Sequence, residues 1–313
     1  NSADMQTKGY ELTLGWQDMF KLAGKPFSYQ VNLTFNDYTS KITKFNNPEK
    51  AFAKGYYEGM RIGEIWGYHI DGIFATDEEA SYEVDQRNVN DIINSSSGSL
   101  KGLHAGDLRF ADLDGDNRIS TGENTVDKPG DRRIIGNSEP RYQYGANLAF
   151  QWCGFDFSIF FQGIGRMDWY PASEAELFWG PFNRPYATFL PKNFLEKCWS
   201  EDNPDAYFPR PRAYVAYDNL NNQCRELTAK NDRYLQNIGY CRLKNLTVGY
   251  TLPKNLTRKV GIDMLRVYFS GENLAYWSGI KTDYIDPEQA RRGGDLKVYP
   301  WQKTFTFGIN VNF

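Results

Sequence analysis

Apolar and polar residues alternate strictly along the segment 303–313. Every second position is apolar, and the positions between them hold Thr, Gly and Asn. Because successive side chains of a strand point to opposite faces, this period of two predicts a β-strand with one apolar face and one small, uncharged polar face. Such a strand suits a barrel wall with lipid outside and a polar lumen inside. The apolar positions are Phe305, Phe307, Ile309, Val311 and Phe313.

The same alternation predicts six further strands along the chain. Each is about ten residues long or somewhat shorter, and about ten residues is the length that a tilted strand needs to cross a bilayer. The segment 41–140 contains either no further crossing or two, so the expected total is seven or nine. The six strands cover residues 10–17, 27–36, 142–152, 155–162, 245–252 and a segment that begins at 265.

The connections between these strands alternate between short and long. Short turns are expected at 22–26, 153–154 and 253–264, and long loops at 41–140, 163–236 and 278–302. Transmembrane barrels show this asymmetry, with short periplasmic turns and long extracellular loops. The sequence therefore predicts an all-β fold: a portion of a large antiparallel transmembrane β-barrel whose final strand runs toward the periplasm. A soluble β-sandwich also alternates, but it would place charged residues on its solvent face and turn every eight to twelve residues.

Seven or nine strands do not make a complete barrel of this kind. Bacterial barrels built from one chain have even strand numbers. An open first strand would also expose unpaired backbone groups to lipid, which membrane proteins do not tolerate. We therefore expect residues 1–313 to be a section of a larger barrel. The start at Asn1, with no initiator Met and no leader, fits a mature form or a fragment.

Composition narrows the class of protein further. The net charge of −3 and pI near 5.6 argue against a nucleic-acid partner, which would favour a basic face. A mean hydropathy of −0.63, without an apolar run near twenty residues, excludes a transmembrane helix. Aromatic residues make up 16% of the chain, as expected where rings line two membrane interfaces.

Four cysteines are too few for a disulfide scaffold. Cys198 and Cys224 either pair or remain free thiols.

The segment 112–123 matches the spacing of a twelve-residue calcium loop. Alternating oxygen ligands on a tight turn can surround a hard cation, and Asn117 replaces the usual Gly at a position that tolerates a left-handed backbone. The alternative is an acidic turn that binds nothing. A structural Ca²⁺ or Mg²⁺ that stabilises a long external loop is the expected role. The expected ligands are the side chains of Asp112, Asp114, Asp116, Ser120 and Glu123 and the backbone carbonyl of Arg118.

The loop 163–236 is rich in aromatic residues that can stack on sugar rings or anchor a protein partner. For any single ring, packing inside the loop is the simpler interpretation. Arginines such as Arg210 and Arg212 are expected to be solvated surface charges, or to bind an acidic substrate or a lid. The aromatic candidates for substrate or partner contact are Trp169, Tyr170, Trp179, Tyr186 and Tyr214.

The sequence offers no catalytic constellation. Its two histidines, His69 and His104, have no paired metal-ligand spacing, and the chain has no nucleophile elbow and no phosphate-binding glycine loop. We therefore predict that the protein is not an enzyme.

Several motifs, in the expected order along the whole chain, resemble the C-terminal part of the SusC/RagA family of TonB-dependent outer-membrane transporters. Among them are Gly106-Asp-Leu-Arg-Phe-Ala-Asp-Leu-Asp-Gly-Asp116 and Leu243-Lys-Asn-Leu-Thr-Val-Gly-Tyr-Thr-Leu-Pro253. The other matching stretches are 1–16, 71–74, 132–137, 144–163, 269–274 and 308–313.

The resemblance implies a 22-stranded barrel in the outer membrane of a Gram-negative bacterium, filled by an N-terminal plug and powered through TonB. It also implies a SusD-like surface lipoprotein as lid, a possible dimer of transporter–lipoprotein pairs, and import of glycan oligosaccharides or peptides. The terminal strand, with its last aromatic Phe313, would then serve as the assembly signal. The plug, the TonB-contacting segment and the earlier strands have no counterpart in these residues. The alternatives are a passive porin, a surface adhesin barrel, or a secreted glycan-binding β domain.

Overall fold

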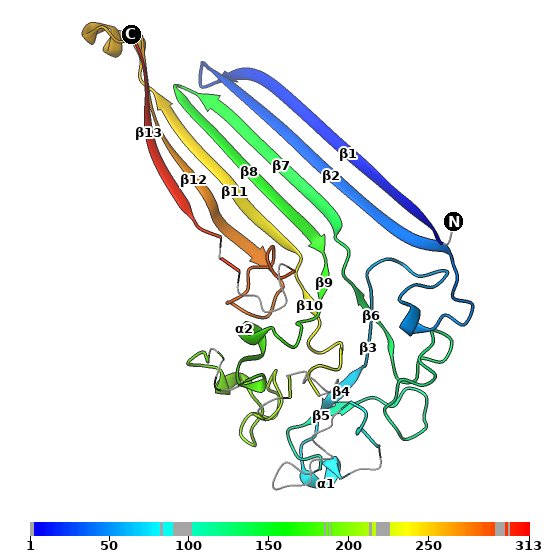
Figure 1. Ribbon diagram of the computed structural model, residues 1–313. Helices are drawn as coiled ribbons and strands as arrows, with labels where there is room; N and C mark the ends of the chain where they lie inside the picture. The colour runs from blue at the N-terminus through cyan, green and yellow to red at the C-terminus, as the bar shows by residue number, and fades with distance from the viewer. Residues whose placement is uncertain are drawn as a thin grey trace.

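Seven long strands form one antiparallel sheet in the computed structural model (Figure 1). The strands follow one another in space in chain order, β1-β2-β7-β8-β11-β12-β13, so β1 and β13 are the sheet edges. Their bounds are β1 Ala3–Leu22, β2 Lys25–Phe45, β7 Arg141–Trp152, β8 Phe155–Arg166, β11 Tyr240–Thr251, β12 Met264–Ser278 and β13 Thr304–Asn312. The structure describes residues 3–81, 84–89, 102–184, 186, 188, 190–212, 215–216, 226–291, 298–299 and 301–313.

The register places the apolar positions of neighbouring strands side by side. Val31 of β2 pairs with Leu148 of β7, and Leu148 pairs with Ile159 of β8. At the other edge Phe269 of β12 pairs with Phe307 of β13, whose side chain is 79% exposed. One face of the sheet is therefore a continuous apolar surface that no part of the described chain covers. The predicted all-β antiparallel fold and its alternation are confirmed.

The first two strands are longer than the alternation predicts. They contain 20 and 21 residues, and they extend beyond the point where β7 begins, since the pairing of β2 with β7 stops at Asn36 opposite Gln143. The extra part carries polar residues on both faces, so the apolar period of two disappears there, but the backbone pairing persists. The hydroxyls of Thr7 and Ser40 share a hydrogen bond of 2.8 Å across this hairpin. The segment 59–62 pairs with the edge of β2 that faces away from β1, where the Ile42 N–H donates to the Met60 carbonyl at 2.9 Å.

The three short connections lie together at one end of the sheet, here called the turn end (Figure 1). Two of them are two-residue turns, Ala23-Gly24 and Cys153-Gly154, in which both residues have positive φ. This left-handed pair matches the twist of a tight hairpin and favours Gly at the second position. The third contains the helical turns α3 (Lys254–Thr257) and η6 (Arg258–Val260). No helix in the described residues is long and apolar enough to span a membrane.

The long loops lie at the opposite end of the sheet and contain only short elements (Figure 1). Within the described part of 46–140, no strand joins the seven-stranded sheet. The paired short strands are β3 (Glu64–Gly67) with β6 (Arg133–Asn137), β4 (Ile70–Ile73) with β5 (Leu108–Phe110), and β9 (Asp168–Trp169) with β10 (Gln236–Asn237). The helical turns are η1 (Phe52–Lys54), α1 (Asp77–Ala80), α2 (Glu176–Trp179), η4 (Gly180–Phe182) and η5 (Leu195–Lys197).

These loops share one hydrophobic core, which local sequence patterns do not predict. The first long loop contributes Leu108 and Phe110, the second Trp179 and Phe208, and the third Ile285. All five side chains are buried. The three loops therefore pack into a single unit, which we call the loop body, although long strands of the sheet separate them along the chain.

Candidate functional site

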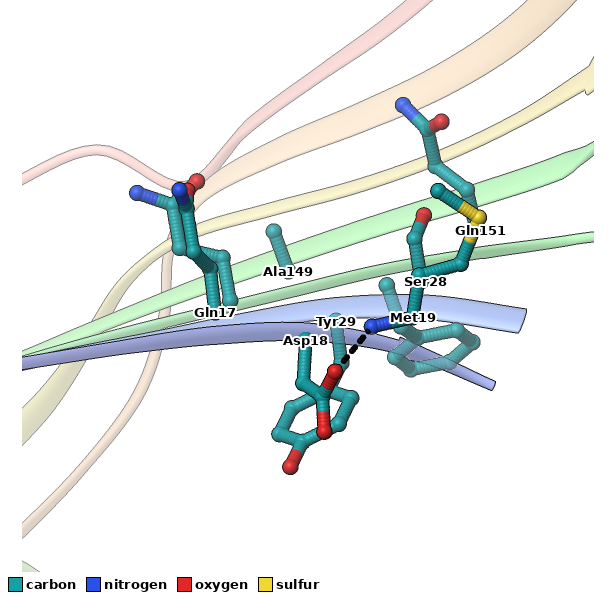
Figure 2. A pocket seen from close by; sticks show the side chains of 9 residues that line it. Gln17, Asp18, Met19, Ser28, Tyr29, Ala149 and Gln151 are labelled. Atoms are coloured by element: carbon teal, nitrogen blue, oxygen red, sulfur yellow. Dashed lines mark hydrogen bonds between the residues drawn. The ribbon is translucent and has the colours of Figure 1, made fainter.

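The face of the sheet opposite the apolar surface is lined by small and amide side chains. At the turn end these side chains surround a shallow depression (Figure 2). Gln17, Ser28 and Gln151 project to one side of the ribbon, whereas Asp18 and Tyr29 project to the other. Such a neutral polar surface can donate and accept hydrogen bonds without binding any one charge strongly.

One ion pair crosses this polar face near the turn end. The Arg266 guanidinium on β12 reaches over β11 to Asp156 on β8, with its Nε at 2.9 Å from the Asp156 Oδ1. The intervening residue of β11 is Gly249, and a Cβ at that position would lie 2.5 Å from the Arg266 Nη2. The guanidinium also lies 4.9 Å from the centre of the Tyr268 ring. The glycine thus leaves space for a polar link between strands that are not neighbours.

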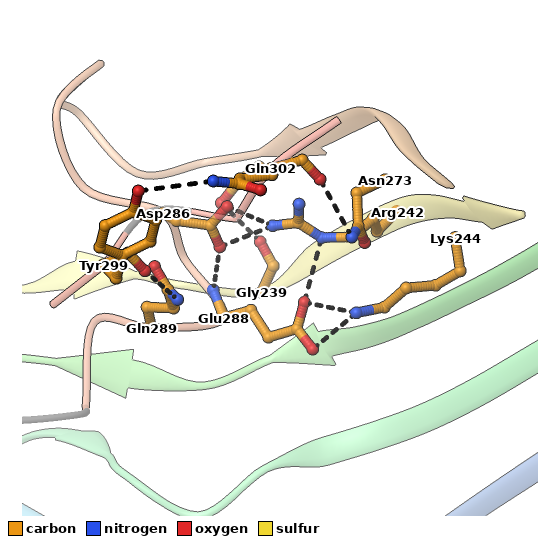
Figure 3. A network of polar contacts seen from close by, with 10 residues as sticks. Gly239, Arg242, Lys244, Asn273, Asp286, Glu288, Gln289, Tyr299 and Gln302 are labelled. Atoms are coloured by element: carbon orange, nitrogen blue, oxygen red, sulfur yellow. Dashed lines mark hydrogen bonds and ion pairs between the residues drawn. The ribbon is translucent and has the colours of Figure 1, made fainter. Parts of the chain in front are cut away.

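A denser network of charges attaches the third long loop to β11 (Figure 3). Arg242 on β11 is buried and contacts both Asp286 (Nη2 to Oδ2, 2.5 Å) and Glu288 (Nε to Oε2, 3.0 Å). Lys244, two residues along the strand, binds Glu288 at 2.8 Å and lies 5.0 Å from the centre of the Trp301 ring. Two cations therefore balance two carboxylates. Because removing one member would leave a buried charge without its partner, this network fixes the position of the third loop.

The aromatic candidates of the second loop differ in what they contact. Trp179 is 1% exposed, and its indole N–H donates to the Ala172 carbonyl at 2.9 Å. Trp169 and Tyr170 are half-buried and pack against the hydrophobic core. Tyr186 is 77% exposed, and Tyr214 lies outside the described residues. Three of the five candidates therefore stabilise the loop body, and Tyr186 is a described candidate with a ring open to a ligand.

The acidic loop brings together the three aspartates among its expected ligands. Oxygen atoms of Asp112, Asp114 and Asp116 lie within 4.8 Å of one another. Asn117 has φ of 61°, the left-handed conformation expected at that position. Glu123 does not belong to this group, and its carboxylate pairs with Lys128 instead. This clustered oxygen set suits a hard cation.

Asp131 is a further carboxylate at this loop, and the twelve-residue spacing could not reveal it. Its two oxygens accept hydrogen bonds from the backbone N–H groups of Leu113 and Ser120, both at 2.7 Å. Burial raises the pKa of Asp131, and the charges of Asp114 and Asp112 act in the same direction. The hydroxyl of Ser120 accepts from the Gly122 N–H at 3.1 Å. Arg118 forms an isolated bridge with Asp85 through its backbone.

The other candidate side chains contact residues elsewhere in the long loops. Arg212, expected to be solvated, is buried and pairs with Asp107. His69 contacts Asp232 (Nδ1 to Oδ2, 2.5 Å). Cys198 is buried, which raises the pKa of its thiol to about 12, and its suggested partner Cys224 lies outside the described residues. These contacts explain the side chains without a catalytic role.

The terminal strand exposes its apolar positions at the edge of the sheet. It pairs with β12 on one side only, from Thr304 opposite Glu272 to Asn312 opposite Met264. The five residues expected to act as the assembly signal are exposed: Phe305, Phe307, Ile309, Val311 and Phe313. No strand of the described chain pairs with the other edge of β13, which can therefore pair with a further strand.

Comparison with known proteins identifies relatives of the whole chain. TonB-dependent receptor P3 of Formosa agariphila is 27% identical over 339 residues, which include 100% of this chain and 29% of the receptor. TonB-dependent receptor P39 of the same organism is 23% identical and matches 100% of this chain. The chain is a relative of TonB-dependent receptors. The resemblance predicted from the motifs is thus confirmed. No protein-family model matches the sequence.

Solved structures share the fold of this chain. The RagAB peptide transporter matches 99% of this chain with a TM-score of 0.62 at 20% identity. The RagAB peptide importer in its closed-closed state matches 98% with a TM-score of 0.59. The chain spans about 30% of each of those chains, and 29% and 31% of the two receptors. Its sheet is therefore a section of a barrel wall of the TonB-dependent transporter type.

Proposed function

We propose that these residues form part of the barrel wall and extracellular loops of an outer-membrane importer that is driven through TonB. The observation that carries this proposal is the two-faced sheet, which has a continuous apolar outer surface and a neutral polar inner one. The similarity to TonB-dependent receptors over the full chain supports the same function. Glycan oligosaccharides or peptides are the proposed cargo, and a SusD-like surface lipoprotein is the proposed partner of the loop body.

The two ends of the sheet have different tasks in this proposed importer. The turn end faces the periplasm, and its amide-lined inner face contacts the plug or the passing substrate. The loop end faces the outside, and the packed loop body presents exposed rings such as Tyr186 to the substrate or the lipoprotein. The open backbones of β1 and β13 are completed by the other strands of the barrel, because unpaired strand edges are too costly in lipid.

The test uses the full-length receptor that contains this chain, in cells with and without a functional TonB. Cells are offered labelled neutral oligosaccharides and labelled oligopeptides, and uptake is measured against a strain that lacks the receptor. Active import predicts saturable uptake of one of these classes that is lost without TonB. Uptake that persists without TonB would indicate a passive porin, and surface binding without uptake would indicate an adhesin.

We also propose that the acidic loop holds a structural Ca²⁺ or Mg²⁺ ion, with Asp131 close to the ligand set. The close approach of Asp112, Asp114 and Asp116 supports this site. A bound cation would reduce the repulsion between these carboxylates and stabilise the turn within the first long loop.

Elemental analysis of the full-length receptor, with limited proteolysis before and after chelation, tests the metal site. Asp114→Asn is expected to lower metal content and to increase cleavage in the first loop. Glu123→Gln is the matched control, because Glu123 pairs with Lys128 and is expected to leave metal content unchanged. Absence of bound metal together with no effect of chelation would refute the site.

A further inference from the structure

Three buried ionisable side chains join the first and second long loops. Asp107, the residue before β5, pairs with Arg212 of the second loop at 2.8 Å between Oδ2 and Nη2. The next residue, Leu108, donates its backbone N–H to the Glu226 carboxylate, which also belongs to the second loop. Residues 107 and 108 are thus attached to two separate parts of the second loop.

Neighbouring backbone contacts extend this junction. The Arg210 N–H donates to the Gly106 carbonyl at 2.8 Å, and the Arg210 guanidinium donates to the Ala105 carbonyl at 3.2 Å. Gly106 has φ of 89°, and a Cβ there would lie 2.4 Å from the Trp199 ring. The chain at 105–108 therefore lies closely against the second loop.

Among the described residues, the buried part of the junction holds two carboxyl groups and one guanidinium. The side chain of Asp107 is 0% exposed and that of Arg212 is 4% exposed, and Glu226 is buried as well. Within the described part of the chain, neither the Asp107 Oδ1 nor the Nη1 and Nη2 atoms of Arg212 form a hydrogen bond, so charge attraction alone holds the pair. Because a second buried negative charge is costly, the group is more stable when one carboxyl is protonated.

We propose that Asp107, Arg212 and Glu226 form a proton-sensitive lock that holds the first and second loops together. The lock is closed when Glu226 is neutral and the Asp107–Arg212 pair is charged. Loss of the Glu226 proton places two buried negative charges beside one guanidinium, and opening of the junction hydrates them.

The charges around the two carboxyl groups favour a proton on Glu226 in the closed junction. Burial raises the pKa of Glu226 to about 8, with a further contribution from the Asp107 charge, while Arg212 acts in the opposite direction. Burial also raises the pKa of Asp107 against the effect of Arg212, Arg210 and His104. Burial raises the pKa of Tyr234 of the same loop well above its usual value, and the Glu226 charge acts in the same direction, while the adjacent Arg233 opposes it. Tyr234 is therefore neutral across the working range.

The direction of the pH dependence follows from proton linkage. An opened, hydrated Glu226 titrates near 4.5, and the closed form titrates near 8. Between these values the closed form holds one proton more, so each unit of rising pH favours opening by up to about tenfold. The lock is strongest below about pH 5, weakens progressively toward pH 8, and changes little above it.

Hydrogen–deuterium exchange of the full-length receptor in detergent tests the lock at several pH values from 5.5 to 8.5. After correction for the intrinsic pH dependence of exchange, peptides covering 104–111 and 206–212 are expected to open up to about tenfold more for each pH unit. Peptides from β11 and β12 serve as an internal reference. Glu226→Gln is expected to abolish the pH dependence, whereas Glu196→Gln, an exposed site on the same loop, retains it.

A second variant keeps the proposal testable if Glu226→Gln folds poorly. Asp107→Asn leaves Glu226 as the one carboxylate beside Arg212, so the pH dependence is expected to move to lower pH. Wild-type peptides that open equally at all pH values would overturn the lock. So would a Glu226→Gln or Asp107→Asn protein that retains the wild-type pH profile.

Discussion

The sheet and the loop body are stabilised in opposite ways. The sheet is two-faced and regular, and many of its large apolar side chains, such as Leu14 and Phe307, are exposed. The loop body is irregular, but it buries Trp179, Phe208 and a group of charged residues around Arg212. Backbone pairing, together with the lipid that we propose around the apolar face, stabilises the first region, whereas side-chain packing stabilises the second. A substitution of the same kind is therefore expected to have different consequences in the two regions.

The largest effect is expected in the core of the loop body. Trp179→Ala removes a ring that lies 4.8 Å from Phe178 and 5.5 Å from Tyr234 between ring centres. Loss of a buried Trp costs about 3–5 kcal/mol. Hydrogen exchange in peptides covering 194–212 of the full-length receptor should increase accordingly, while the sheet retains its protection. Equal loss of protection in β7 and β8 would show that the two regions do not differ as described.

A charge on the apolar face of the sheet tests whether lipid surrounds that face. Leu148→Arg places a guanidinium near the middle of the apolar surface, where contact with lipid predicts a destabilisation of about 2–4 kcal/mol. Urea unfolding of the full-length receptor in liposomes measures this change. The matched control is Asn147→Arg, one residue away on the polar face, for which we expect a much smaller effect. If both variants behaved alike, the two faces would not have different surroundings.

A smaller effect is expected where neighbouring strands approach most closely. At Gly163 on β8 an added Cβ would lie 2.4 Å from the Tyr240 carbonyl oxygen, which belongs to the backbone and cannot rotate away. Gly163→Ala should therefore destabilise the sheet by about 1–3 kcal/mol through overpacking. The same urea experiment measures it, and unchanged stability would contradict the close approach of β8 and β11.

The smallest effect on stability is expected at the exposed ring of the loop body. Tyr186→Ala should change the free energy of unfolding by less than about 0.5 kcal/mol, because its side chain is 77% exposed. If Tyr186 contacts a substrate or a lipoprotein, the variant should nevertheless weaken that binding in a titration with the purified partner. A stability loss similar to that of Trp179→Ala would place this ring inside the core instead.

The two regions also differ in how well the sequence predicts them. Alternation places the seven strands and the apolar face correctly, because a period of two follows directly from strand geometry. It underestimates β1 and β2, where residues such as Thr7 and Lys8 form a hairpin without an apolar face. The loop body is poorly predicted because its contacts join residues far apart in the chain. Local spacing cannot reveal that Asp131 approaches Asp112, or that Arg212 is buried against Asp107.

Alternating accessibility along one strand tests whether one face of the sheet contacts lipid and the other face a polar lumen. Single cysteines at positions 146–151 of β7 would be placed in a full-length receptor without its own cysteines, in outer-membrane vesicles. We expect a water-soluble thiol reagent to label positions 147, 149 and 151, and a lipid-soluble quencher to reach probes at 146, 148 and 150. Uniform labelling by the water-soluble reagent, or the reverse alternation, would contradict this expectation.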